Sequence, residues 1–232
     1  ARIGIFPFAP GGGVAIPGGT NRCWIEVLLI VCLDLEGVLT PEIWIGLAER
    51  TGIDALRATT RDIPDYDTLM RQRLKLLDEN NLGMADIQAV VAGLEPLPGA
   101  RDFLDWIRNR WPLVILSDTF YEFADPFMAA LGRPTLFCHQ LKIAANGHID
   151  DYQLRLADHK RASIQSFHAL NFNTVAVGDS FNDTSMLAEA NTGILFHAPE
   201  NIVAEFPQYP SVNEYDELKA LIEQAAENSN GR

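Results

Sequence analysis

A short apolar run that stops at two acidic residues constrains the fold of this chain most. Residues 27–33 read Val-Leu-Leu-Ile-Val-Cys-Leu, and Asp34, Glu36 and the turn residue Gly37 follow. The run is too short to span a membrane, but it fits a central parallel strand that is covered on both faces. Because open α/β sheets bind ligands at the carboxyl ends of their strands, we expect Asp34 to face a binding site. Taken alone, the segment also fits a capped strand end with a solvated acidic turn.

The charge balance limits the partners that the chain can bind. Its 232 residues include 18 basic and 31 acidic side chains, which give a net charge of −13. Such a charge repels nucleic-acid backbones and anionic membrane surfaces, so we expect no nucleic-acid and no membrane partner. The three cysteines, Cys23, Cys32 and Cys138, form no CxxC motif, which indicates reduced thiols rather than disulfides or a zinc site. These features predict a cytoplasmic protein and leave open whether it forms a homodimer.

An irregular segment and a helical insertion divide the predicted fold. Residues 1–26 are rich in glycine and proline and lack any period, so we expect an irregular N-terminal extension, a candidate for a non-native segment. Residues 41–95 show no strand signal, and they contain three helical patterns, one capped by Thr40, one from about Asp65 and one from about Met84. The predicted domains are an α/β core at 27–40 and 96–232 and a helical cap at 41–95.

Beyond Pro96 the chain alternates between predicted helices and strands. The Asn146-Gly147 pair is a strong hairpin signal between two strands, and Pro126 is expected to kink or split the helix that contains it. This alternation predicts an α/β fold with a doubly wound, Rossmann-like parallel sheet. The expected strands are 113–116, 135–143, 149–154, 174–177 and 193–196, and the expected helices are 101–110, 120–131, 160–170, 182–190 and 215–227.

Three of the predicted strands end on polar residues at the same edge of the sheet, which predicts a pocket there. Carboxylate and amide oxygens of this kind suit Mg²⁺, which takes one or two carboxylates and keeps positions for water or substrate oxygens. The residues at these strand ends and in the adjoining loops and helix start are Asp34, Ser117, Asp118, Lys160, Asp179, Asn182 and Asp183.

These groups are the parts that phosphoryl transfer through an aspartyl-phosphate requires. Asp34 would attack phosphorus, and Glu36 would protonate the leaving oxygen and later deprotonate the acceptor. Ser117 and Lys160 would hold the phosphoryl oxygens. Positioning and charge neutralisation supply most of the catalysis in such a reaction.

Four motifs in this order resemble those of the haloacid dehalogenase-like phosphatases. The helical insertion after the first motif resembles the small cap of their phosphoserine phosphatase branch. Segments 41–44, 59–67 and 196–201 are similar to bacterial members of that branch that also transfer phosphate from phosphoserine to homoserine. The motifs are Asp34-Leu35-Glu36-Gly37-Val38, Leu116-Ser117-Asp118, Lys160 and Gly178-Asp179-Ser180-Phe181-Asn182-Asp183.

The resemblance implies a role for each of these residues. Asp34 would be the nucleophile and Glu36 the acid and base, with Lys160 as a third catalytic residue. Glu42 and Arg73 match positions that grip the amino and carboxylate groups of phosphoserine. The implied Mg²⁺ ligands are Asp34, Glu36 through its main-chain carbonyl, and Asp179, with Asp183 as a support, and the implied substrate-binding residues are Glu42, Arg73, Ser117, Asp118, Lys160 and Asn182.

Two residues depart from the wider phosphoserine phosphatases, which have aspartate in place of Glu36 and glycine in place of Asp118. The extra methylene of Glu36 moves its carboxyl by about one bond length, and catalytic geometry is sensitive at about the 1 Å level. Asp118 adds a negative charge near the phosphoryl group. Both departures fit the transferase-like members, and both affect the expected rate of simple hydrolysis.

Other interpretations remain open at this stage. The chain could hydrolyse another small phosphomonoester, or it could be a non-catalytic phosphate-binding module of the same fold. Glu42 fits the helix dipole without any ligand, and Arg73 could form an ion pair on a solvated surface. Because the histidines show no ligand spacing, structural roles are expected for His139, His148, His159, His168 and His197.

Overall fold

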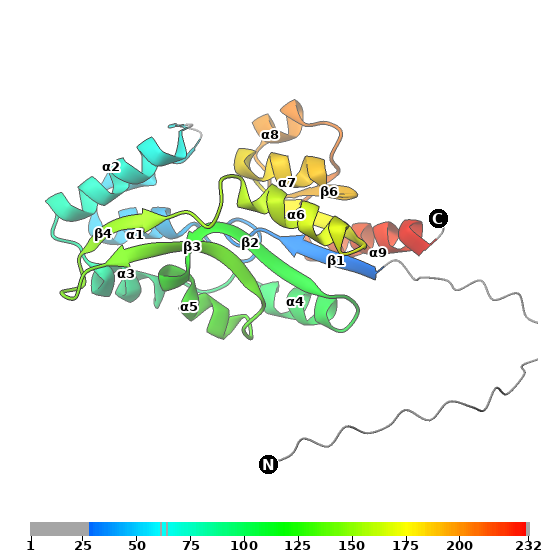
Figure 1. Ribbon diagram of the computed structural model, residues 1–232, viewed down its shortest axis with the longest axis horizontal. Coiled ribbons are helices and arrows are strands. Elements are labelled where there is room, and N and C mark those ends of the chain that lie inside the picture. Colours follow the sequence, from blue (N-terminus) through cyan, green and yellow to red (C-terminus); the bar gives the residue numbers. More distant parts are fainter. Residues whose placement is uncertain (1–27, 61, 64, 231–232) are drawn as a thin grey trace, which may run out of the picture.

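The computed structural model describes residues 28–60, 62–63 and 65–230, so the predicted N-terminal extension lies outside the described residues. This part of the chain forms a seven-stranded sheet in the order β4-β3-β2-β1-β5-β6-β7 (Figure 1). Only β4 runs antiparallel to its neighbour, and the predicted α/β fold with a doubly wound sheet is confirmed. The strands are β1 (Leu28–Leu33), β2 (Leu113–Phe120), β3 (Leu136–Ile143), β4 (Ile149–Gln153), β5 (Phe172–Gly178), β6 (Thr192–Phe196) and β7 (Ser211–Val212).

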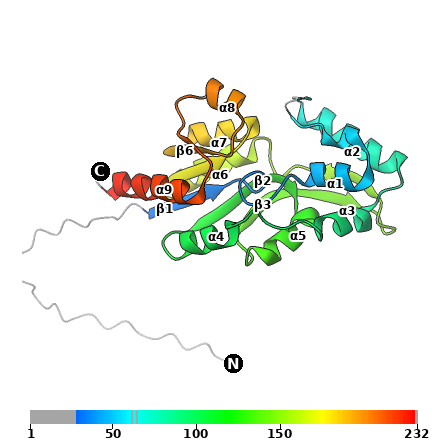
Figure 2. The same cartoon turned by 180° about the vertical axis from the view of Figure 1, so that it is seen from behind.

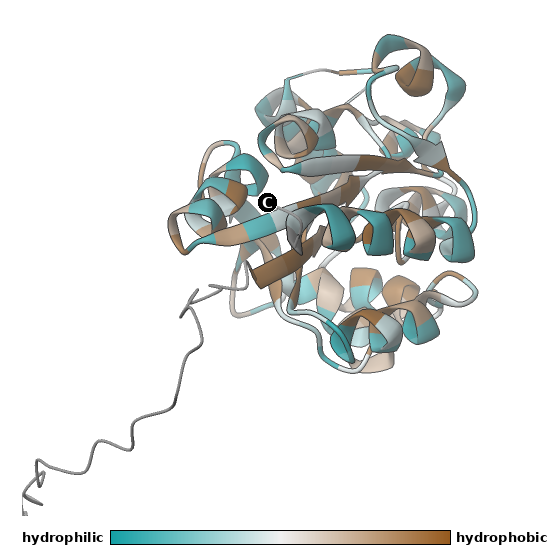
Figure 3. Cartoon of the chain, turned by 90° about the vertical axis from the view of Figure 1, so that its right-hand side faces the viewer, coloured by the Kyte–Doolittle hydropathy of each residue, from teal (hydrophilic) through white to brown (hydrophobic). Residues whose placement is uncertain are grey.

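Helices cover both faces of the sheet, as the two opposite views in Figures 1 and 2 make visible. Side chains of β1 alternate between two cores: Val31 and Leu33 pack toward α4, α5 and α9, and Ile30 and Cys32 pack toward α6, α7 and α8. Figure 3 shows hydrophobic strands running between helices that carry both hydrophobic and hydrophilic residues. The helices are α1 (Ile43–Thr51), α2 (Tyr66–Glu79), α3 (Met84–Val91), α4 (Ala100–Arg108), α5 (Tyr121–Ala130), α6 (His159–Ala169), α7 (Thr184–Glu189), α8 (Glu200–Glu205) and α9 (Tyr215–Asn230).

The chain changes direction across the sheet between β1 and β5. From β1 it proceeds to β2, β3 and β4 on one side, and it then crosses to β5, β6 and β7 on the other. Such a reversal opens a crevice at the carboxyl ends of the two central strands. Asp34 follows β1 and Asp179 follows β5, so the topology places these two carboxylates at the crevice.

Some local predictions were wrong. Helix α1 begins at Ile43 with Glu42 at the N-cap position, and the predicted cap Thr40 instead donates its hydroxyl to Leu35 O at 3.3 Å. Of the two outcomes expected for Pro126, a split is excluded because Pro126 lies inside the continuous helix α5, and a kink stays a prediction. The second predicted strand continues past Leu116 to Phe120 with an irregular register. Predicted helix 182–190 divides into a 3₁₀ turn and α7, and α8 and β7 were not predicted.

The insertion between β1 and α4 contains helices α1 to α3 and a 3₁₀ turn at Asp54–Arg57, with no strand among its described residues. Its hydrophobic side chains are not separate from the core, because Trp44 of α1 meets Phe123 of α5 edge to face at 5.6 Å and both belong to one buried cluster. The predicted division into a core and a cap at 41–95 stays a prediction.

The predicted hairpin at Asn146-Gly147 is present, and it contacts helix α2 of the insertion. Arg71 pairs with Asp151 at 2.7 Å, and the Tyr152 hydroxyl donates to Asp67. At the hairpin tip, His148 lies between two carboxylates, with Nδ1 2.9 Å from Asp150 Oδ1 and Nε2 3.0 Å from Asp78 Oδ1. The hairpin therefore holds α2 through polar contacts at several points along its length.

We expect His148→Gln to lower the Tm by about 1–2 °C at about pH 5 and by less at about pH 9. Hydrogen bonds to Asp150 and Asp78 raise the pKa of His148 above its ordinary value of 6.5. The stabilisation is therefore complete below that ordinary value and is lost as the pH rises through the raised pKa. Thermal melts at the two pH values measure it, and an equal Tm difference at both would exclude a role for the imidazolium charge.

The described residues also bear on two predictions made from composition. None of the helices that the structure describes combines the length and the apolar character of a membrane span. Cys32 and Cys138 are both free and buried, and burial raises the pKa of each thiol. Cys23 lies outside the described residues.

Candidate active site

The turn after β1 fixes Asp34 at the base of the crevice. Asp34 is only 4% exposed, its N–H donates to Val177 O at 2.9 Å, and the next N–H, of Leu35, donates to its Oδ1 at 2.8 Å. Gly37 adopts a φ of +78°, and a Cβ at this position would lie 2.4 Å from Asp179 Oδ2. A side chain here would therefore collide with Asp179, so glycine permits the two loops to meet.

Lys160 is the cation at the centre of the site. It lies near the start of α6 with 2% exposure, and its Nζ is 3.1 Å from Asp34 Oδ1, 3.2 Å from Asp118 Oδ2 and 2.8 Å from Asp183 Oδ1. Burial alone would lower the pKa of Lys160, but the three carboxylates hold it well above its ordinary value. The lysine is therefore charged and immobilised against Asp34.

The loop after β5 is held together by Asp183. Its Oδ2 accepts the N–H groups of Asp179 at 3.0 Å and Ser180 at 3.2 Å, and its Oδ1 meets Lys160. A Cβ on Gly178 would lie 2.3 Å from the Asp183 carboxyl carbon, so the backbone passes directly over this side chain. Asp183 thus orients Asp179 and Lys160 together.

The carboxylates at this edge form a set suited to a divalent cation. Asp34, Asp179 and Asp183 each offer an oxygen within 4.8 Å of the others. Burial and repulsion from Asp183 raise the pKa of Asp34 well above its ordinary value, and burial and the same neighbour raise the pKa of Asp179 to about 7. A hard cation would relieve this repulsion, so the residues fit Mg²⁺. The carboxylate of Glu36, a predicted ligand through its carbonyl, does not belong to this group.

A cavity of about 330 Å³ opens above these residues and brings most of the predicted site together. The Ser117 hydroxyl lies in it with 2% exposure and accepts the N–H of Thr119 at 3.3 Å. Of the predicted residues, Lys160 and Asp183 do not line this cavity and contact Asp34 or its neighbours as described above. The predicted residues that line it are Asp34, Glu36, Glu42, Arg73, Ser117, Asp118, Asp179 and Asn182.

Glu36 connects the nucleophile turn to the helical insertion. Its Oε2 accepts the N–H of Ile43 at 3.0 Å, which points the carboxyl at the start of α1. Burial raises the pKa of Glu36 above its ordinary value, although hydrogen bonds with Ile43 and Glu42 oppose that shift. A carboxyl with a raised pKa keeps its proton more readily than a free glutamate does, which suits a general acid.

Arg73 comes from α2 and lies deep in the cavity wall. It is 8% exposed, its guanidinium carbon lies 4.4 Å from the centre of the Trp44 ring, and Nη2 donates to Ala58 O at 2.8 Å. Its buried Nε has no partner among the described residues. The alternative of an ion pair on a solvated surface is therefore wrong.

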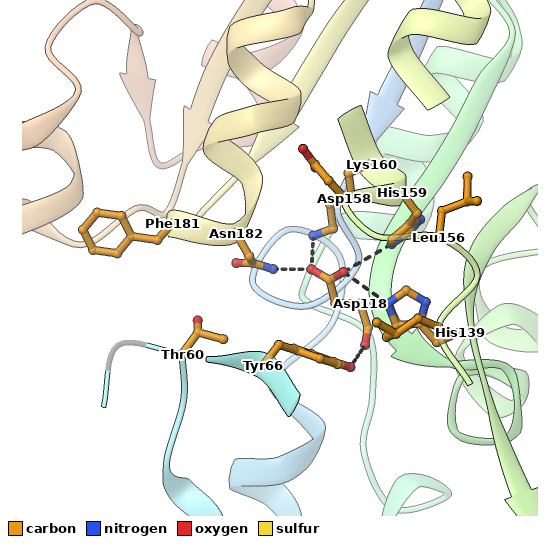
Figure 4. Close-up of a pocket in the computed structure, with 11 residues that line it drawn as sticks. Thr60, Tyr66, Asp118, His139, Leu156, Asp158, His159, Lys160, Phe181 and Asn182 are labelled. Atoms are coloured by element: carbon orange, nitrogen blue, oxygen red, sulfur yellow. Dashed lines mark hydrogen bonds and ion pairs between the residues drawn. The ribbon is translucent and has the colours of Figure 1, made fainter. Parts of the chain in front are cut away.

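A second cavity, of about 560 Å³, adjoins the first and contains residues that sequence reasoning missed (Figure 4). Tyr66 and Asp118 line both cavities, and the Tyr66 hydroxyl donates to Asp118 O at 2.9 Å. His139 and His159 approach Asp118 from the other side. Their positions, 20 residues apart on different elements, match no ligand spacing, so the sequence carried no signal for them.

This fold and this arrangement of carboxylates around a lysine define the class of the protein. A family model for haloacid dehalogenase-like hydrolases matches residues 28–191, and the chain belongs to this family. The family resemblance predicted from the four motifs is confirmed.

Two relatives and one solved structure show which members of the family the chain resembles. Phosphoserine phosphatase ThrH of Pseudomonas aeruginosa is 61% identical over 190 residues, which cover 82% of this chain and 93% of that protein. A phosphoserine phosphatase of Pseudomonas syringae pv. tomato is 56% identical over 213 residues, or 90% of this chain and 89% of that protein. A solved substrate-bound phosphoserine phosphatase complex shares the fold with a TM-score of 0.69 at 20% identity, over 84% of this chain and 97% of that one.

Proposed function

We propose that the chain is a Mg²⁺-dependent phosphoserine phosphatase that also transfers the phosphoryl group to homoserine, through a phosphoryl group carried on Asp34. The observation that carries this proposal is the placement of buried Asp34 at the base of a cavity, 3.1 Å from Lys160. The names of the two Pseudomonas relatives support phosphoserine as the substrate.

In the first half-reaction an Asp34 oxygen attacks phosphorus as the bond to the serine oxygen breaks. The Glu36 carboxyl gives its proton to the departing oxygen, which its raised pKa favours. Lys160 and the Ser117 hydroxyl hold the phosphoryl oxygens. Mg²⁺, held by Asp34 and Asp179 with Asp183 behind them, would supply charge neutralisation for the phosphoryl oxygens.

In the second half-reaction an alcohol or water attacks the phosphorus and the bond to Asp34 breaks. Glu36, now a carboxylate, takes the proton of the attacking hydroxyl. Water yields free phosphate, and the hydroxyl of homoserine yields phosphohomoserine. The longer reach of Glu36 compared with aspartate supports transfer to a bound alcohol, because it alters where the attacking oxygen is activated.

Arg73 and Glu42 supply the groups that would recognise the amino-acid part of the substrate. The unpartnered Nε of Arg73 is a donor in a cavity wall, where a carboxylate could accept from it. Glu42 lines the same cavity, near enough to Arg73 to influence its pKa. A zwitterionic amino acid presents the opposite charge to each of these groups.

One incubation tests the whole proposal. We expect phosphoserine with Mg²⁺ to give free phosphate, and added homoserine to divert part of the product to phosphohomoserine, which ³¹P NMR distinguishes from phosphate. Omitting Mg²⁺ and adding a chelator should stop both products, because the carboxylates at Asp34 then repel the phosphate.

The other outcomes separate the alternatives. Phosphate without phosphohomoserine would leave a phosphatase and remove the transferase. Turnover of p-nitrophenyl phosphate with none of phosphoserine would favour a hydrolase of another phosphomonoester, and no turnover of either would favour a non-catalytic module.

A further inference from the structure

The Asp118 carboxylate lies among side chains from β3, from α6 and from the loop after β5. Its Oδ2 accepts Asn182 Nδ2 at 2.7 Å and lies 3.2 Å from Lys160 Nζ. Its Oδ1 lies 3.2 Å from His159 Nε2 and 3.5 Å from His139 Nε2 (Figure 4). Oδ2 is therefore engaged by two nitrogen donors, whereas Oδ1 lies close to two imidazole rings, of which His159 completes no hydrogen bond among the described residues.

The hydrogen bonding of His139 fixes where its proton lies. The N–H of Arg155 donates to His139 Nδ1 at 3.2 Å, so Nδ1 is the acceptor nitrogen of the ring. The proton of a neutral ring must then be on Nε2, the nitrogen that faces Asp118. Burial lowers the pKa of the neighbouring His159, which disfavours the charged form of this ring.

This arrangement argues against a metal site at Asp118, His139 and His159, and against direct contact between Asp118 and phosphate. Asp118, His139 and His159 have the residue types of a metal site, and their ligand atoms lie within 4.8 Å of one another. A metal at His139 Nε2 would move the ring proton to Nδ1, where the Arg155 N–H already points. Direct contact of the Asp118 carboxylate with a phosphate would be repulsive, and its Oδ2 already has two partners.

We propose that His139 and His159 are positioning residues that act through Asp118 on Lys160 and Asn182. His139 Nε2 faces Oδ1 at 3.5 Å, and the His159 ring packs against His139 and lies beside the same oxygen. The two rings restrict the carboxylate plane and keep Oδ2 on Lys160, which contacts Asp34, and on Asn182, which lines the cavity. The inference rests on the proposed function, and it replaces the predicted contact between Asp118 and substrate with an indirect role.

The helical insertion contributes to the same arrangement. The Tyr66 hydroxyl, from the first turn of α2, donates to Asp118 O, and its ring meets His139 edge to face at 6.0 Å. Asp118 thus receives its backbone contact from the insertion and its side-chain contacts from the core. The orientation of Lys160 depends on both.

A pair of amide variants tests the proposal. In His139→Asn the side-chain oxygen takes the place of Nδ1 and can accept from Arg155, but nothing reaches Asp118. In His139→Gln the amide nitrogen reaches the place of Nε2 and keeps a donor to Asp118. We expect the asparagine variant to lose about tenfold in kcat, the effect of one hydrogen bond to a charged group, and the glutamine variant to lose less than about threefold.

The split between kcat and KM distinguishes positioning from packing. Because Lys160 and Asn182 act on the phosphoryl group, the KM for phosphoserine should stay within about twofold in both variants. Equal losses in the two variants would assign His139 to core packing, and no loss in either would also overturn the proposal. If the His139 variants do not fold, as judged by thermal melts, His159→Asn and His159→Gln repeat the comparison.

The same variants also distinguish a failure of this inference from a failure of the proposed function. If the wild-type protein hydrolyses p-nitrophenyl phosphate and not phosphoserine, the substrate proposal fails and the variants are compared on p-nitrophenyl phosphate. If it hydrolyses neither, the Kd for vanadate, which mimics the phosphoryl group in transfer, should be about tenfold weaker in His139→Asn than in His139→Gln when measured by calorimetry. Equal affinities would then overturn the positioning role.

Discussion

Asp34→Asn is expected to abolish phosphate release from phosphoserine and from p-nitrophenyl phosphate, with a loss of more than about 1,000-fold. The carboxamide cannot form the bond to phosphorus that the proposed mechanism requires. The asparagine oxygen can still accept the N–H of Leu35, so the turn after β1 should keep its shape. Phosphate assays with each substrate measure the loss, and intact-protein mass spectrometry should detect a trapped phosphoryl group in the wild type alone.

Two controls keep this result interpretable. Asp216→Asn removes an exposed carboxylate on α9, paired with Lys219, and should leave activity unchanged. The Tm of Asp34→Asn should not fall, because burial and repulsion from Asp183 already disfavour the Asp34 charge. Substantial residual turnover in a folded variant would refute Asp34 as the nucleophile.

Arg73→Ala is expected to lower kcat/KM for phosphoserine by about 50-fold, the range of a charge-assisted hydrogen bond, while turnover of p-nitrophenyl phosphate persists. The guanidinium would bind the substrate carboxylate, a group that p-nitrophenyl phosphate lacks. Steady-state kinetics on both substrates measure this selectivity.

Because Arg73 packs on Trp44 and is buried, the alanine variant could also lose activity through a loosened insertion. Arg73→Met is the matched control, since it keeps most of the buried chain and removes the charge and the donors. Equal losses on both substrates in Arg73→Met would contradict a role in recognising the amino acid.

The sequence predicted those parts of the fold that depend on local pattern. The apolar run before Asp34 predicted β1, and Asn146-Gly147 predicted the hairpin of β3 and β4. Strand β7 has two residues and α8 has six, which is too short for a periodic signal. Thr40 has the residue type of a helix cap, but its hydroxyl bonds within the turn after β1, so tertiary context decided against local propensity.

The candidate site also contains residues that could be predicted from the sequence and residues that could not. Asp34 and Asp179 could be placed from the sequence because each directly follows a strand, and parallel strands bring their carboxyl ends to one edge. The burial of Arg73 could not be predicted from the sequence, because the hydrophobic period of helix α2 shows only which residues share a face. How α2 is rotated about its axis against Trp44 and Ala58 depends on tertiary packing.

By itself, the sequence determined a parallel α/β sheet with acidic groups at one edge and a lysine able to reach them, since those features follow from strand pattern and strand direction. Only the tertiary structure decided what surrounds Asp118. Its contacts with Tyr66 and Asn182 join residues 52 and 64 positions apart. Contacts over such separations leave no period or spacing in the sequence, because they depend on how complete elements pack together.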